Sequence, residues 1–239
     1  MNRYTAGRLI RDVPRREMLI TEWGNTKDII NAIMRVVDKD HLKSQVGEFA
    51  EKFKGDTPQE TYDSLLKLWR FCRSHIRYKK DPKGVQYIKH PGRVIKDGYS
   101  DCKGLSILIY HVCRYLELPV FIRFSSYERD RRIGHVYPMV VIGNEAIPVD
   151  AVFEYFDAEE KPTYYKDYYP AVYRTAELKS IARQSHPAVL AGIVEGMPQW
   201  MKGMFAGLSF YQAYNSKNMV LKGAYTILGG YYTKQFFSK

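Results

Sequence analysis

The stretch GYSDCKG at residues 98–104, followed directly by the apolar run LSILIYHVCRYLEL at 105–118, decides the fold that the sequence predicts. Ser100 or Asp101 can cap a helix that opens at Cys102, because their side-chain oxygens accept hydrogen bonds from the free N–H groups of a first helical turn. Apolar residues cover most sides of this helix, which is typical of a buried element. The sequence therefore predicts a central helix with a thiol in its first turn, running to about Glu117 and stopping before a proline.

Cys102 is the candidate nucleophile of the chain. The N-terminus of a helix presents unpaired N–H groups and the positive end of the helix dipole, and both favour a thiolate over a thiol. Cys72 and Cys113 lie among apolar residues at helical spacing, so we expect them in the core. Three well-separated cysteines do not suit a disulfide framework, and this indicates folding in a reducing compartment.

Three strand-like segments follow the helix, at residues 120–124, 135–142 and 145–149. Their short connections predict an antiparallel meander. His135 opens the second segment and Asp150 follows the third. A meander packed against a buried helix is an α+β fold, and its neighbouring strands can bring an imidazole and a carboxylate to the start of the helix.

The order cysteine, histidine, aspartate suits a catalytic triad. Such a triad needs a thiolate, a histidine that moves the proton and a carboxylate that orients the imidazole. Cys102, His135 and Asp150 are the candidates for these three roles. Each residue type taken alone is more often structural, so the hypothesis depends on the order of the three and on the helix and meander around them.

An oxyanion hole beside Cys102 needs two hydrogen-bond donors. The backbone N–H of Cys102 can supply one, because the acyl oxygen would lie at the helix N-terminus. The second can come from Gln86, Tyr87 or Tyr78 in the preceding segment, and Gln86 is favoured for its amide donor. A structural role is the alternative for each of these three residues.

The sequence carries no recognisable cofactor or metal motif. His111 and Cys113 are too close on one helix to point the same way, so they do not form a zinc pattern with Cys102. Gly229-Gly230 lacks the Lys-Ser or Lys-Thr of a phosphate-binding loop. We therefore expect neither a cofactor nor a metal.

Two helices are predicted before the stretch quoted above. Asn25 or Thr26 can cap the first. The sequence TPQE at 57–60 is a capping box with proline at the first helical position, and this second helix should end near His75. Turn signals crowd residues 78–98, so a long loop is expected there.

Composition divides the chain into three parts. Residues 1–24 are basic and lack a clear period, which predicts an arm that packs on the domain or on a partner. Residues 25–175 are the predicted catalytic domain, and their tyrosine-rich end, from Tyr155, suits a groove lining, an interface or an irregular wrap. Residues 176–239 are a predicted appendage, helical or irregular. From about Pro187 its Gly- and aromatic-rich sequence suits a helical packing element, an assembly surface or a membrane-contacting element.

The net charge of +11 suits either an anionic partner or a solvated basic surface without a partner. Composition does not choose among nucleic acid, membranes, cell-wall polymers and acidic proteins, and no nucleic-acid-binding motif supports the first of these. The N-terminal residues lack an apolar stretch of signal-peptide length, and the uncharged stretch at 203–216 is shorter than the roughly 20 residues that span a bilayer. The chain is therefore expected to be made in the cytoplasm.

Several of these motifs resemble one family. GYSDCKGLS at 98–106, GHV at 134–136 and IPVD at 147–150 resemble the transglutaminase-like superfamily, whose members have a papain-like fold and a Cys-His-Asp triad. The resemblance covers roughly residues 65–153, and the segment at 76–108 is particularly similar to transglutaminase-like proteins encoded by bacteriophages. The phage-like pattern often has acidic residues directly after the cysteine, whereas this chain has Lys103-Gly104, which adds a positive charge beside the thiolate.

The resemblance implies a function for the three candidate residues. Cys102 would be the nucleophile, His135 the base and Asp150 its orienting partner in an enzyme that attacks an amide or peptide bond. The substrate would be a protein or peptide, cell-wall peptides included, with water as the default acceptor and an amine as the alternative. The resemblance also allows a structural virion or assembly protein that keeps this fold with little or no activity and binds virion proteins through its C-terminal appendage. A virion-carried enzyme would combine the two.

Overall fold

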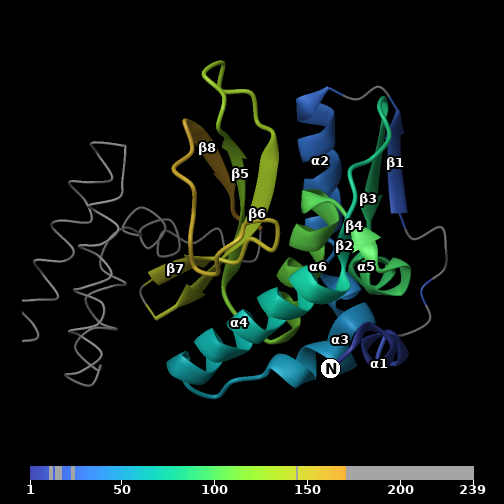
Figure 1. The fold of residues 1–239 in the computed structure, drawn as a ribbon, viewed down its shortest axis with the longest axis vertical. Coiled ribbons are helices and arrows are strands. Elements are labelled where there is room, and N and C mark those ends of the chain that lie inside the picture. Colours follow the sequence, from blue (N-terminus) through green and yellow to red (C-terminus); the bar gives the residue numbers. More distant parts are fainter. Residues whose placement is uncertain (11–12, 14–17, 23–24, 144, 171–239) are drawn as a thin grey trace, which may run out of the picture. The chain divides into compact units, whose positions relative to one another are not determined.

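The computed structural model describes residues 1–10, 13, 18–22, 25–143 and 145–170, and all of them belong to one compact unit, Met1–Gln184. Figure 1 shows an antiparallel sheet on one side of a central helix and further helices on the other side. The unit is therefore a mixed α+β structure, as the sequence predicts. The predicted appendage at 176–239 lies outside the described residues.

Helix α6, Cys102–Tyr115, forms the centre of the unit, and every residue of it except the two ends is buried. The Asp101 carboxylate caps the helix by accepting hydrogen bonds from the backbone N–H groups of Lys103 (3.1 Å) and Gly104 (3.4 Å). The helix ends before the expected Glu117, because Glu117 has a φ of 60°, in the left-handed region that does not continue a helix.

A four-stranded antiparallel sheet packs against α6, with its strands in the order β7-β6-β5-β8. The strands are β5 Val120–Ser126, β6 His135–Ile142, β7 Glu145–Pro148 and β8 Tyr164–Tyr168. Strands β5, β6 and β7 confirm the predicted meander. Strand β8 is a correction, because this part of the tyrosine-rich segment pairs with β5 instead of wrapping irregularly.

The two faces of this sheet bury different sets of side chains, since side chains alternate along a strand. One face meets α6 and contributes Val120, Ile122, Phe124, Val136 and Val140 to the main core. The opposite face holds a second, smaller cluster, made of Phe121, Tyr137, Met139, Val141 and Ala146. His135 is the first residue of β6, so it lies at the end of the sheet rather than within either cluster.

The two predicted N-terminal helices are present. Helix α2, Thr26–Val37, is capped by Asn25. Helix α4, Pro58–His75, begins with the predicted capping box, in which the Glu60 N–H donates to Thr57 Oγ1 over 3.2 Å and the Glu60 side chain accepts from the Thr57 N–H. Both helices contact α6, and short elements complete this layer, namely η1 Asp40–Val46, α3 Gly47–Ala50 and η2 Glu51–Phe53.

The loop expected at 78–98 contains regular structure instead. Strand β3, Val85–Lys89, pairs antiparallel with β1, Met18–Glu22, and is followed by the short helix α5, Pro91–Asp97. The prediction was wrong because β3 depends on a partner strand from the distant basic segment at 1–24, which also forms helix α1, Arg3–Arg8. The two-residue strands β2, Arg77–Tyr78, and β4, Tyr99–Ser100, pair in parallel and lead the chain into α6.

Among the described residues, no helix combines the length and the apolar character needed to cross a lipid bilayer.

Candidate active site

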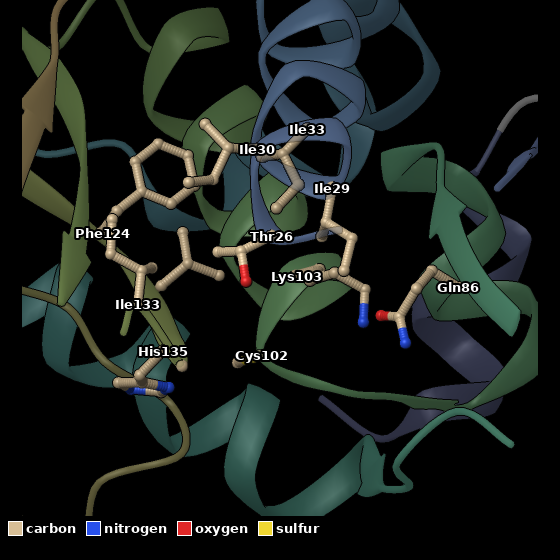
Figure 2. A pocket seen from close by; sticks show the side chains of 12 residues that line it. Thr26, Ile29, Ile30, Ile33, Gln86, Cys102, Lys103, Phe124, Ile133 and His135 are labelled. Atoms are coloured by element: carbon tan, nitrogen blue, oxygen red, sulfur yellow. The ribbon is translucent and has the colours of Figure 1, made fainter. Parts of the chain in front are cut away.

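Cys102 and His135 line the same pocket, which has a volume of about 210 Å³. Cys102 is the first residue of α6 and is partly buried. Figure 2 shows the His135 ring facing Cys102 from the start of β6. The pairing of α6 with this end of the sheet therefore brings together the thiol and the imidazole that the sequence singles out.

Asp150 completes the arrangement from the segment that follows β7. Its Oδ2 lies 2.6 Å from His135 Nε2, and its Oδ1 accepts a hydrogen bond from the backbone N–H of Val152 over 2.9 Å. Its backbone carbonyl accepts a buried hydrogen bond of 2.7 Å from the indole N–H of Trp69 in α4. Asp150 is thus held at both carboxylate oxygens and at its backbone carbonyl. Because His135 Nε2 is occupied by Asp150, Nδ1 is the ring nitrogen left to exchange a proton with Cys102.

The surroundings of His135 favour its protonated form. Its side chain is only 16% exposed, and burial by itself disfavours a charge. Hydrogen bonds and charge interactions with Asp150 and Cys102 outweigh burial and raise the pKa of His135 from 6.5 to about 10. The His135 imidazole is therefore suited to carry a positive charge beside Cys102 at neutral pH.

Ser106 connects the backbone of the nucleophile to that of the histidine strand. Its Oγ lies 2.7 Å from the carbonyl oxygen of Cys102 and 2.9 Å from the carbonyl oxygen of Val136. Val136 follows His135 directly in β6. Hydrogen bonding of this buried hydroxyl therefore holds the first turn of α6 against the start of β6.

The positive charge expected beside the thiolate is neutralised within the protein. The Lys103 side chain is 8% exposed, and its Nζ forms ion pairs with Asp101 and, over 3.1 Å, with Asp81. Burial opposes its charge, but these two carboxylates outweigh burial and raise the pKa of Lys103. Lys103 therefore serves to hold Asp81 and the capping Asp101 together, and its ammonium is not a free charge offered to a substrate.

The structure places the three oxyanion candidates differently. Gln86, in β3, lines the pocket together with Cys102, as Figure 2 shows. Tyr78 is close enough to Cys102 to interact with it electrostatically. Burial and then this interaction raise the pKa of Tyr78 to about 12. Tyr87 lines a different pocket with Asp81, and its backbone N–H donates to Asp81 over 2.8 Å. Gln86 and Tyr78 are thus near the nucleophile, and Tyr87 is not a lining residue there.

The other cysteines confirm their predicted place in the core. Cys72 and Cys113 are fully buried and free of disulfides. Burial raises the pKa of Cys72 to about 12 and raises that of Cys113 as well, so both stay as thiols at neutral pH. Within the described ranges, no group of three or more His, Cys, Asp or Glu side chains is arranged to hold a metal ion.

Three residues of the site were not found from the sequence. Trp69 has helical apolar spacing and indicates only a core position. Asp81 precedes a proline and indicates only a turn. Ser106 carried the best available signal, a hydroxyl one turn after Cys102 within an otherwise apolar run, which needs a hydrogen-bond partner when buried.

No family model matches the chain, and no curated protein matches it. Among solved structures, the chain is similar to a candidate cysteine protease from Cytophaga hutchinsonii, with a TM-score of 0.36 and 17% sequence identity. The likeness covers 56% of this chain and 48% of that chain, so it spans less than half of the other protein.

Proposed function

We propose that this protein is a thiol enzyme of the transglutaminase-like type, with a papain-like placement of helix and sheet, which attacks an amide or peptide bond. The observation that carries the proposal is the position of His135, whose Nε2 is bound to Asp150 at 2.6 Å while the ring faces Cys102. These three residues supply a nucleophile, a proton carrier and a carboxylate that orients the carrier. A peptide or protein is the substrate class that this chemistry suits.

In the proposed reaction, the Cys102 thiolate attacks the carbonyl carbon of the amide and forms a C–S bond, while negative charge moves to the carbonyl oxygen. The C–N bond then breaks, and the His135 imidazolium gives its proton to the leaving amine. A water attacks the resulting thioester and passes a proton to His135. The C–S bond breaks, and the carboxylic acid leaves. An amine in place of water would form a new amide, and water is the acceptor we propose.

Donors for the developing oxyanion lie beside Cys102. Its own backbone N–H is at the free N-terminus of α6, where no residue of the helix accepts from it. The Gln86 amide lines the same pocket, and the Tyr78 hydroxyl, with its pKa raised to about 12, is a proton-bearing donor at neutral pH. We propose the Cys102 N–H as the first donor and the Gln86 amide as the second.

The proposal is tested by labelling with fluorescent iodoacetamide at mildly acidic pH, where an ordinary thiol reacts slowly. The wild-type protein should be labelled at Cys102, with the site identified by mass spectrometry. Cys102→Ala and His135→Ala should lose the label, and Cys72→Ala should keep it because Cys72 is fully buried. Equal labelling of wild type and Cys102→Ala contradicts the proposal and favours a structural role for the fold.

The acceptor is tested separately with a casein substrate and a fluorescent primary amine. Release of peptides without incorporation of the amine supports hydrolysis. Incorporation that depends on Cys102 supports transamidation and overturns the choice of water.

A further inference from the structure

The pocket that contains Cys102 has a reactive end and an apolar end. Figure 2 shows Cys102 and His135 at one end, with the side chains of Ile30, Ile33 and Phe124 grouped at the other. Ile33 and Phe124 are 2% exposed and belong to the main core, whereas Ile29 and Ile30 are partly exposed on the same helix. Helix α2 therefore forms one wall of the pocket, and the part of its apolar side that is only partly buried faces the pocket.

The charged side chains among the described lining residues of this pocket have partners of opposite charge. Among the described residues that line the pocket, the charged side chains besides Cys102 are His135, which is paired with Asp150, and Lys103, whose ammonium is paired with Asp81 and Asp101. The remaining polar lining comes from the neutral side chains of Thr26 and Gln86. A charged substrate side chain that entered the apolar end would lose its hydration without gaining an ion pair, which is unfavourable.

The pocket is large enough for a whole side chain. A cavity of roughly 150 Å³ lined by aliphatic and aromatic side chains binds benzene, and the volume here is about 210 Å³. A branched aliphatic or aromatic side chain therefore fits.

We infer that this pocket, with its wall on α2, selects substrates that carry an apolar side chain in the acyl part, at one of the two residues next to the bond that is attacked. The inference rests on the proposed function, because it takes Cys102 as the point of attack. The inference also extends the proposed function, because the selection comes from Ile29 and Ile30 rather than from the triad. Both residues belong to α2, which lies outside residues 65–153, the stretch that resembles the transglutaminase-like superfamily.

The test uses acyloxymethyl ketone peptides, which alkylate a cysteine that they can reach. The peptides are acetyl-Gly-X and acetyl-X-Gly ketones, with Leu, Phe, Lys or Asp at X, and the rate of Cys102 alkylation is measured. At one of the two positions, the peptides with Leu or Phe should alkylate Cys102 at least about tenfold faster than those with Lys or Asp. Small differences in apolar contact change reaction rates by about this factor. Equal rates for all four residues at both positions overturn the inference.

A specificity change in one variant tests the wall itself. Ile30→Asp places a carboxylate at the pocket, so the ratio of Lys to Leu rates should rise about tenfold. Met34→Asp is the matched control, because Met34 is partly buried on the same helix but does not line the pocket. Its ratio should equal that of the wild type. If circular dichroism shows that Ile30→Asp does not fold, Ile30→Ala replaces it, and its larger pocket should shift the preference from Leu toward Phe. An unchanged ratio in the folded Ile30 variant overturns the role of α2.

Failure of this inference can be distinguished from failure of the proposed function. Iodoacetamide has no side chain to place in the pocket, so its reaction reports only the reactivity of Cys102. Loss of the iodoacetamide reaction counts against the proposed function. Normal iodoacetamide reaction without a side-chain preference among the ketones counts against the pocket alone.

Discussion

Trp69 donates its indole N–H to the backbone carbonyl of Asp150 over 2.7 Å, although 81 residues separate the two in the sequence. The Asp150 side chain binds His135, so this contact fixes the segment that carries the orienting carboxylate against helix α4. Arg73, one turn further along α4, donates to the carbonyls of Val152 and Phe153 in the same segment. Helix α4 therefore supports the site without contributing a reacting atom.

Trp69→Phe keeps most of the ring and removes this one donor. We expect it to lower the free energy of unfolding by about 1 kcal/mol and to slow iodoacetamide labelling of Cys102 at mildly acidic pH, because Asp150 is less firmly held. Tyr62→Phe is the matched control, since it removes a 3.1 Å hydrogen bond from the same helix to Asp157. The control should lose similar stability with no change in labelling rate. A labelling rate that is the same in both variants contradicts a positioning role for Trp69.

The pH range of activity should depend on Asp150. His135 has a pKa of about 10 with Asp150 and Cys102 beside it, so hydrolysis should decline only as the pH rises through about 10 and the leaving amine loses its proton donor. Asp150→Asn removes the carboxylate, and we expect the alkaline limit to move down toward the ordinary histidine value of 6.5. The measurement is the pH profile of peptide hydrolysis. Asp157→Asn is the control. If the two variants have the same pH profile, Asp150 does not set the alkaline limit through His135.

The buried His111 should make the fold less stable as the pH falls. This histidine is fully buried, its Nδ1–H donates to the Ile107 carbonyl over 2.9 Å, and burial lowers its pKa to about 4. Between pH 6.5 and 4 the unfolded chain binds a proton that the folded protein does not. Stability should therefore be complete above 6.5 and fall as the pH drops toward 4, by on the order of 3 kcal/mol.

Denaturant unfolding of variants at several pH values checks this expectation. His111→Leu should flatten the dependence of unfolding free energy on pH between 6.5 and 4. His41→Gln, which alters an exposed histidine, should leave the slope as it is in the wild type. If folded His111→Leu keeps the wild-type dependence of unfolding free energy on pH, groups other than His111 cause the loss of stability in acid.

Gly104 is required because the backbone of α6 passes close to β4. A Cβ at this position would lie 1.9 Å from Ser100 Oγ and 3.0 Å from Ser100 Cβ. We expect Gly104→Ala to destabilise the fold by about 1–3 kcal/mol, the usual cost of overpacking. Gly7→Ala, in a helix where a Cβ meets nothing within 4 Å, should instead stabilise by up to about 1 kcal/mol.

The cause of the Gly104 effect can be assigned with a second change. Adding Ser100→Gly to Gly104→Ala removes the two nearest of the three atoms that the new methyl group would meet and leaves only Val94 Cγ2, at 3.3 Å. The melting temperature of the double variant should then be higher than that of Gly104→Ala. If the melting temperature does not recover, the steric conflict of Gly104→Ala is not with Ser100.

The parts of the fold that could be predicted are those specified by neighbouring residues. The capping box at Thr57, the cap at Asp101 and the bounds of β6 all depend on signals within a few positions. The pair of His135 and Asp150 could also be anticipated, because one hairpin joins them and their separation is only 15 residues.

What could not be predicted depends on partners far away in the chain. Strand β8 forms because Tyr164–Tyr168 meets the free edge of β5, and β3 forms because the distant β1 lies beside it. The contact between Trp69 and Asp150 has the same character, since neither residue indicates the other. The neutralised charge of Lys103 likewise depends on Asp81, which reaches it through a separate segment.

Helix α6 both carries Cys102 and is buried on all sides by the sheet and the N-terminal helices. Amide hydrogens in such an element exchange with solvent mainly when the whole unit opens, since local opening would expose the core. The nucleophile therefore has no low-energy route to detach from its partners while the rest stays folded. Thermal inactivation and global unfolding of this unit should then be a single cooperative event, with no folded but disassembled site between them.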